Sequence, residues 1–195
     1  DERKVLRRVT TKARKRDSAQ AAARMTTLDE SGQRVFLDDP PVLGRLRGDQ
    51  REGIEDLFRI YLGTVSPDIA LLLSQYRLAD IARRVVGVGS VGTRCFVLLL
   101  EGPNDDVLIL QVKEAGPSVL FEWGGIADAR ADHEGARVVS HQRILQAMSD
   151  PFIGHLHAGD VHYYVRQFRD MKGGVDVARL TPQQYTTFVA GCAHA

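Results

Sequence analysis

Apolar side chains recur at helical spacing in the first part of the chain and gather into strand-like runs further along. Residues 49–62 place Ile54, Leu57 and Tyr61 three or four positions apart, which puts them on one face of an amphipathic helix. A second short helix is expected over 66–73, where Ser66 precedes a proline that suits the first helical turn. The first part of the chain is therefore predicted to be mainly helical.

From about residue 77 the pattern changes to short apolar runs separated by turn residues, which is typical of strands. One further short strand is expected earlier, over 34–37, before a connector at Pro40-Pro41. Strands are predicted over 94–100, 107–112, 152–157 and 161–168, with a helix over 134–148 between the second and third of these. Helices, consecutive strands, a helix and two more strands predict an α+β fold with an antiparallel sheet.

The same pattern divides the chain into three parts. Residues 1–76 are expected to form a helical N-terminal extension, 77–172 a sheet-containing lobe, and 173–195 a linker and a C-terminal helix. That last helix reaches the final residue without a glycine or asparagine stop signal, so we expect a fragment of a longer protein. Its apolar stripe, Tyr185, Phe188, Val189 and Cys192, is then expected to be exposed.

Composition excludes several classes of protein. Of the 195 residues, 44% are apolar and 26% charged, which is ordinary for a globular protein and argues against wholesale disorder. The longest apolar run, 96–100, is far too short to cross a membrane. Two cysteines cannot form a disulfide framework or a four-cysteine zinc site, and without a secretory signal the cytoplasm is the expected compartment.

The net charge of +1 conceals a basic N-terminal segment. Residues 1–24 contain nine Lys or Arg and three acidic side chains, which could indicate nucleic-acid binding. However, Val5, Leu6 and Val9 recur near helical spacing, and no aromatic side chain is present to stack on bases. We therefore expect this helix to pack on the protein, and nucleic acid is not an expected partner.

The most informative motif is the glycine-rich segment 86–94. Gly87, Gly89 and Gly92 follow the spacing Gly-x-Gly-x-x-Gly, and Ser90 lies between the last two. A dinucleotide-binding motif would require a helix next, whereas the run that follows is strand-like. The expected arrangement is strand, glycine loop, strand, in which backbone N–H groups can approach phosphates. The alternative is a glycine-rich hairpin turn without a ligand.

The next predicted strand ends in Lys113. Protein kinases cover the ATP phosphates with a glycine-rich loop and place a phosphate-binding lysine on the third strand, held by an acid on the following helix. Glu134, at the predicted helix start, or Glu122 upstream would be that acid. The alternative is a lysine that extends from a strand end into solvent.

Two further groups could carry chemistry. Gln167, Phe168 and Arg169, at the end of the last strand, are expected to form the hinge beside a nucleotide base, or else a solvated strand end. His155, His157 and His162 flank one turn and could bind zinc, but Asp160 is the nearest carboxylate and the sequence favours no metal site. His133 and His141 are expected to be partly exposed at the surface, and no residue is predicted to be catalytic.

Longer motifs bring in a family resemblance. The segments ARKRDSAQA, VGVGSVGTRC, LQVKEAGPSVL and YYVRQFRDMKG resemble the bacterial family named domain of unknown function 2252. The resemblance implies a longer protein with upstream Gly-Asp-x-His-x-x-Asn and Asp-Phe-Asp segments, which look like the catalytic and metal-binding loops of kinase-like phosphotransferases. This chain contains neither, and its Gly159-Asp160-Val161-His162 segment is interpreted as a turn.

These observations together predict a kinase-like small lobe, similar to that of protein kinases and aminoglycoside phosphotransferases. The expected function is nucleotide binding, with ATP and Mg²⁺ as cofactors, within a phosphotransferase that is inactive as this fragment. The expected partners are the nucleotide and the remainder of a longer chain, with no membrane. The alternative is a non-catalytic binding or interaction module of the same shape.

Overall fold

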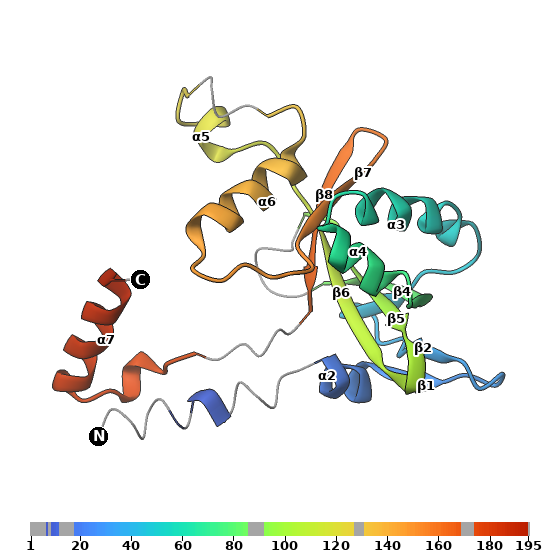
Figure 1. Cartoon of the computed structure of the whole chain (residues 1–195), viewed down its shortest axis with the longest axis horizontal. Coiled ribbons are helices and arrows are strands. Elements are labelled where there is room, and N and C mark those ends of the chain that lie inside the picture. The colour runs from blue at the N-terminus through green and yellow to red at the C-terminus, as the bar shows by residue number, and fades with distance from the viewer. Residues whose placement is uncertain are drawn as a thin grey trace.

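A six-stranded antiparallel sheet forms the centre of the computed structural model, which describes residues 7, 9–11, 18–85, 92–126, 131–168 and 174–194 (Figure 1). Its strands lie in the order β3-β4-β5-β6-β8-β7, and a separate two-stranded sheet pairs β1 with β2. The strands are β1 (Thr26–Leu28), β2 (Arg34–Phe36), β3 (Leu43–Arg45), β4 (Arg77–Arg84), β5 (Cys95–Glu101), β6 (Val107–Glu114), β7 (Gly154–Ala158) and β8 (Val161–Gln167).

Helices pack on the sheet, lie in the longer connections or follow the last strand. They are α2 (Ser18–Met25), α3 (Ile54–Leu62), α4 (Pro67–Leu73), α5 (Val119–Glu122), α6 (Glu134–Leu145) and α7 (Pro182–His194). Short 3₁₀ segments cover Gly48–Arg51, Pro103–Asp105 and Val177–Arg179. Because α6 lies in the connection between β6 and β7, the chain leaves the sheet after β6 and returns at β7, which forms its edge. The next strand, β8, then lies between β6 and β7.

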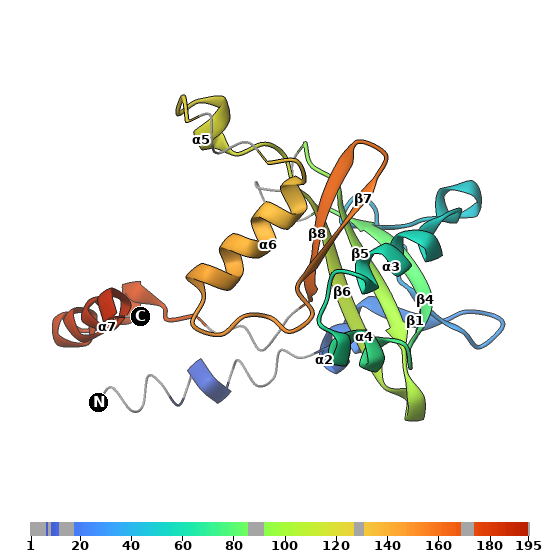
Figure 2. The same cartoon turned by 45° about the horizontal axis from the view of Figure 1, so that its top comes forward.

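Each face of the sheet carries its own apolar core, because successive side chains on a strand point to opposite faces. On one face α3 and α4 cover the larger core, which includes Tyr61, Leu98, Leu110 and Val165. On the other face α2 packs on the smaller core, in which Val97, Leu99 and Ile109 are fully buried beside Phe168. Figure 2 shows the helices α3 and α6 on different sides of the β7–β8 hairpin.

Helix α6 sits very close to the sheet at its first turn. A Cβ atom at Gly135 would lie 2.2 Å from the carbonyl oxygen of Tyr163, so a side chain there would collide with the backbone of β8. Val139, one helical turn further along, is also buried. The absence of a side chain at Gly135 therefore sets how closely α6 approaches the strand.

The structure confirms the predicted α+β class, the antiparallel sheet and most of the expected elements. Residues 26–28, 43–45 and 119–122 form short elements that the sequence pattern did not predict. The helix expected over 49–62 begins later, at Ile54. Short strands such as β1 and β3 offer too few alternating positions to distinguish them from loops, since their pairing partners determine them.

The expectations for the two ends of the chain have different outcomes. In α7, Tyr185, Val189 and Cys192 are exposed, as predicted for its apolar stripe, while Phe188 is half-buried. Val5 and Leu6 of the basic segment lie outside the described residues. None of the helices in the described part of the chain is long and apolar enough to span a membrane.

Candidate functional site

Side chains from four strands form one row across the sheet beside the glycine-rich segment. Cys95 of β5 pairs with Lys113 of β6, Lys113 pairs with Tyr164 of β8, and Tyr164 pairs with His155 of β7. Directly paired residues in an antiparallel sheet point to the same face. The lysine therefore lies on the face that carries α2 and α6, opposite the core beneath α3.

The glycine-rich segment joins β4 to the antiparallel strand β5, and β5 begins at Cys95. Two antiparallel strands therefore flank this segment as predicted, and the described residues from Gly92 onward lead into a strand rather than a helix. Gly92 has a φ of +84°, a left-handed conformation that favours glycine. Gly87, Gly89 and Ser90 lie outside the described residues, so their predicted contact with phosphates stays a prediction.

Lys113 is half-buried, and none of the described carboxylates lies within 4.0 Å of its ammonium group. Glu134 is buried at the start of α6, but its carboxylate pairs with Arg137 one turn along the same helix. Glu122 is exposed in α5. Neither acid therefore holds Lys113 in this structure, which leaves the charge of the lysine without an acidic partner among the residues described.

Two arginines add positive charge to the same face. Arg166 pairs with Gln111 in the row next to Lys113, and its buried Nε atom has no hydrogen-bond partner within the described part of the chain. Burial raises the pKa of the Cys95 thiol, and the nearby charges of Lys113 and Arg84 oppose that rise. Three cationic side chains, from β4, β6 and β8, therefore lie on the face of the sheet that carries Cys95.

The predicted hinge is anchored to the protein through its backbone. The Phe168 N–H donates to the carbonyl of Ile109 at 2.8 Å, and the Gln167 N–H donates to the Asp150 carboxylate at 2.7 Å. The ring of Phe168 is buried, with the guanidinium of Arg84 4.6 Å from its centroid. These two N–H donors are thus already used, and Arg169 lies outside the described residues.

The histidines near the β7–β8 turn form a larger cluster than the sequence indicated. The ring of His133 stacks on His162 at 4.2 Å and meets His155 edge-on at 4.5 Å, with His157 at 5.9 Å between centroids. His133 is half-buried, in line with the expected partial exposure, but its ring also packs on the hairpin, because this residue immediately precedes α6. Among the residues described, no group of three or more His, Cys, Asp or Glu is arranged to hold a metal ion.

Sequence reasoning did not single out Arg84 or His133 for this site, and it placed Arg166 only in the polar cluster at the end of the last strand, beside the expected hinge. The alternation along β8 could have placed Arg166 on the same face as Tyr164, once the strand was paired with β6. No local signal could have joined His133 to the hairpin, because that contact depends on how α6 crosses the sheet.

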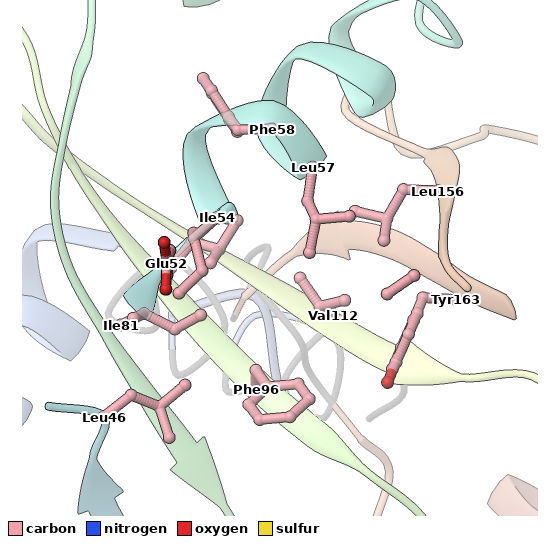
Figure 3. A pocket seen from close by; sticks show the side chains of 12 residues that line it. Leu46, Glu52, Ile54, Leu57, Phe58, Ile81, Phe96, Val112, Leu156 and Tyr163 are labelled. Atoms are coloured by element: carbon pink, nitrogen blue, oxygen red, sulfur yellow. The ribbon is translucent and has the colours of Figure 1, made fainter. Parts of the chain in front are cut away.

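An apolar cavity of about 170 Å³ lies on the opposite face of the sheet, between α3 and the strands. Figure 3 shows Leu57 from α3 above Val112 and Ile81 from the sheet, with Tyr163 and Leu156 at one side. The strand residues that line it alternate with those of the row that contains Lys113 and therefore point to the opposite face. The sheet thus separates this cavity from the lysine. The cavity is therefore a different place from the predicted phosphate site.

Comparisons with known proteins give one result. The family described as "Uncharacterized protein conserved in bacteria (DUF2252)" matches residues 1–195, which is the whole chain. Comparison with curated proteins and with solved structures gives no match.

Proposed function

The chain belongs to the DUF2252 family, and from that premise and the geometry around Lys113 we propose that it binds the phosphates of a nucleotide. The observation that carries the proposal is the position of Lys113. It lies on a strand next to the glycine-rich connection, on a face with two further cations, and without a described acidic partner. A half-buried ammonium group is costly unless a negative charge meets it, and a phosphate would supply that charge.

The arrangement of elements supports a kinase-like reading of this site. A glycine-rich connection between the first two strands, a lysine on the third and a helix in the following crossover are the parts that protein kinases use to hold ATP. Here β4, β5, β6 and α6 occur in that order, and β8 lies between β6 and β7 in the sheet. In the proposal Gly92 and its neighbours cover the phosphates, Lys113 pairs with them, and Mg²⁺ arrives bound to the phosphates.

A phosphotransferase would need further parts, and the proposal assigns no catalytic residue in this chain. The glutamate at the start of α6 would hold Lys113 after a shift of its carboxylate from Arg137. Transfer of the phosphoryl group would rely on segments outside this sequence. The proposed role of the chain is therefore the nucleotide-binding part of a kinase-like protein.

One observation favours the alternative, a non-catalytic interaction module of kinase-like shape. The buried Glu134 carboxylate is paired with Arg137, and the backbone N–H groups of Gln167 and Phe168 are occupied within the protein. A module that had lost nucleotide binding would keep the sheet and α6. It would not need the Glu134 carboxylate or the hinge N–H groups to be available for Lys113 and a nucleotide.

Thermal unfolding with different ligands distinguishes the two functions. The melting temperature of the protein would be measured with ATP and Mg²⁺, with inorganic triphosphate, and with adenosine. We expect both ATP and triphosphate to raise the melting temperature, because the cations recognise phosphates. The rise is expected to be larger with ATP. At 100 times its Kd a ligand adds about 2.7 kcal/mol to stability. Unchanged melting with both phosphate ligands would contradict nucleotide binding and favour the interaction module.

A further inference from the structure

Four histidines meet where the first turn of α6 rests on the β7–β8 hairpin, and we call them the histidine cluster. They are His133, His155, His157 and His162. His155 and His157 alternate with Leu156 on β7, and His157 pairs directly with His162 of β8. The ring of His133, just before α6, stacks on the ring of His162. The cluster is thus the contact surface between the helix and the hairpin.

Two of these rings accept hydrogen bonds that fix the start of α6. The Nδ1 atom of His133 accepts from the backbone N–H of Ala136 at 3.2 Å, which makes His133 the N-cap. The Nδ1 atom of His162 accepts from the backbone N–H of Glu134, also at 3.2 Å. A protonated imidazole carries hydrogen on both nitrogens and cannot accept. Both rings must therefore be neutral for α6 to begin as it does.

A positive charge on a ring of the histidine cluster would have no acidic partner close by among the described residues. The first turn of a helix already presents partial positive charge, so a cationic ring there is unfavourable. No described carboxylate lies within 4.0 Å of a ring nitrogen of the cluster, and Glu134 is engaged with Arg137. Among the residues that the structure describes, the buried Nε2 atom of His133 and the buried Nδ1 atom of His155 find no hydrogen-bond partner.

The charged groups around the cluster come from all the elements that pack there. On α6 these are Arg143, whose charge acts on His155, and the Glu134–Arg137 pair. On the sheet, Lys113 and Tyr164 occupy the row that ends in His155. Asp132 lies beside His133 in the chain, and Asp160 lies in the β7–β8 turn. The cations Arg137, Arg143 and Lys113 thus equal in number the acids Glu134, Asp132 and Asp160, so no excess of negative charge is available to stabilise a protonated ring.

We propose that the histidine cluster makes the contact between α6 and the β7–β8 hairpin sensitive to pH, so that acidification loosens the first turn of α6 from the sheet. This inference does not depend on nucleotide binding, because it rests on the contact between helix and hairpin alone. The Gly135 backbone lies against Tyr163 in the same turn, so loss of the two hydrogen bonds affects the closest contact between α6 and β8.

The direction of the pH dependence follows from the neutral state that the contact requires. Burial and the neighbouring histidines hold the pKa of His133 below its ordinary value of 6.5, and burial and Arg143 do the same for His155. When a pKa is lower in the packed state, the unpacked state binds more protons. The contact is therefore most stable above pH 6.5 and weakens as the pH falls below that value.

Hydrogen exchange of the backbone amides of α6 at pH 7.5 and pH 5.5 tests this proposal. Protection factors, which remove the intrinsic pH dependence of exchange, are expected to fall about tenfold or more on acidification, because both hydrogen bonds at the start of α6 are then lost. In the double variant His133→Asn, His162→Asn the amide oxygens can still accept the two hydrogen bonds but cannot titrate. Because His155 can still titrate in this variant, its protection is expected to fall on acidification, but clearly less than that of the wild type.

His141→Asn is the matched control, because His141 lies on the exposed side of α6 and contacts only the Arg137 carbonyl of its own helix among the hydrogen bonds described. This variant should lose protection as the wild type does. The proposal is overturned if the wild type keeps its protection at pH 5.5, or if the double variant loses as much. Should the double variant not fold, NMR titration of the wild type decides. Titration of His133 and His155 at or above pH 6.5 would also overturn the proposal.

Discussion

Asp80→Ala is expected to destabilise the protein by about 3 kcal/mol or more, because breaking a buried ion pair leaves uncompensated charge. The Asp80 side chain is fully buried, and its carboxylate accepts from Arg45 Nε at 2.9 Å and Arg51 Nη1 at 2.5 Å. It also accepts from the buried backbone N–H of Phe36 at 2.8 Å. One carboxylate thus joins β2, β3, the segment Gly48–Arg51 and β4.

The free energy of unfolding, measured with urea, checks this expectation. Asp80→Asn keeps an oxygen for the Phe36 N–H but removes the charge, so it should lose less than the alanine variant. Asp56→Ala is the control, since its pair with Arg59 is largely exposed and pairs of that kind contribute about 1 kcal/mol or less. Equal and small losses for Asp80→Ala and Asp56→Ala would mean that the buried carboxylate does not connect these strands.

Gly135→Ala is expected to destabilise the protein by about 1–3 kcal/mol, the usual cost of forcing an extra methyl group into a packed site. The added Cβ would lie 2.2 Å from the Tyr163 carbonyl oxygen, and backbone atoms on both sides cannot move aside as a flexible side chain could. Alanine is the better helix former, so the isolated helix would gain while its packing on β8 is lost.

A glycine elsewhere provides the matched control for this variant. Gly191 lies in α7, and a Cβ added there meets nothing within 4 Å. Gly191→Ala should therefore leave stability unchanged or raise it by up to about 1 kcal/mol, as expected for a helical glycine in open space. A Gly135→Ala protein as stable as the wild type by thermal unfolding would show that α6 does not rest on β8 as closely as described.

The sequence predicted the central sheet well because its strands are long and strongly apolar. The runs over 94–100 and 107–112 contain enough consecutive aliphatic residues to identify β5 and β6 within one or two positions at most ends. The buried Asp80 breaks the apolar pattern of β4. No local pattern could show that two arginines distant in the sequence and a backbone amide bind its carboxylate. Interactions that connect segments far apart in the chain therefore limited the prediction of the fold.

In the candidate site, too, features that depend on local order could be predicted, and contacts between distant segments could not. Lys113 follows an apolar strand after a glycine-rich connection, and this local order was sufficient to single it out. The acid expected to hold it was inferred from order alone, and in the structure Glu134 pairs with Arg137 instead. The positions of Arg166 and His133 depend on how β8 and α6 pack, which spacing along the chain does not reveal.

Equilibrium binding of ATP to the wild type and to Lys113→Met tests the central claim most directly. Methionine keeps the packing of the half-buried stem and removes the charge, so melting temperature in the absence of ligand should change little. Hydrogen bonds to charged groups contribute about 1.5–3 kcal/mol, so affinity should fall about tenfold or more. Arg59→Met, which removes an exposed charge on α3, should bind as the wild type does. The same ATP affinity in wild type and Lys113→Met would contradict the proposed phosphate site.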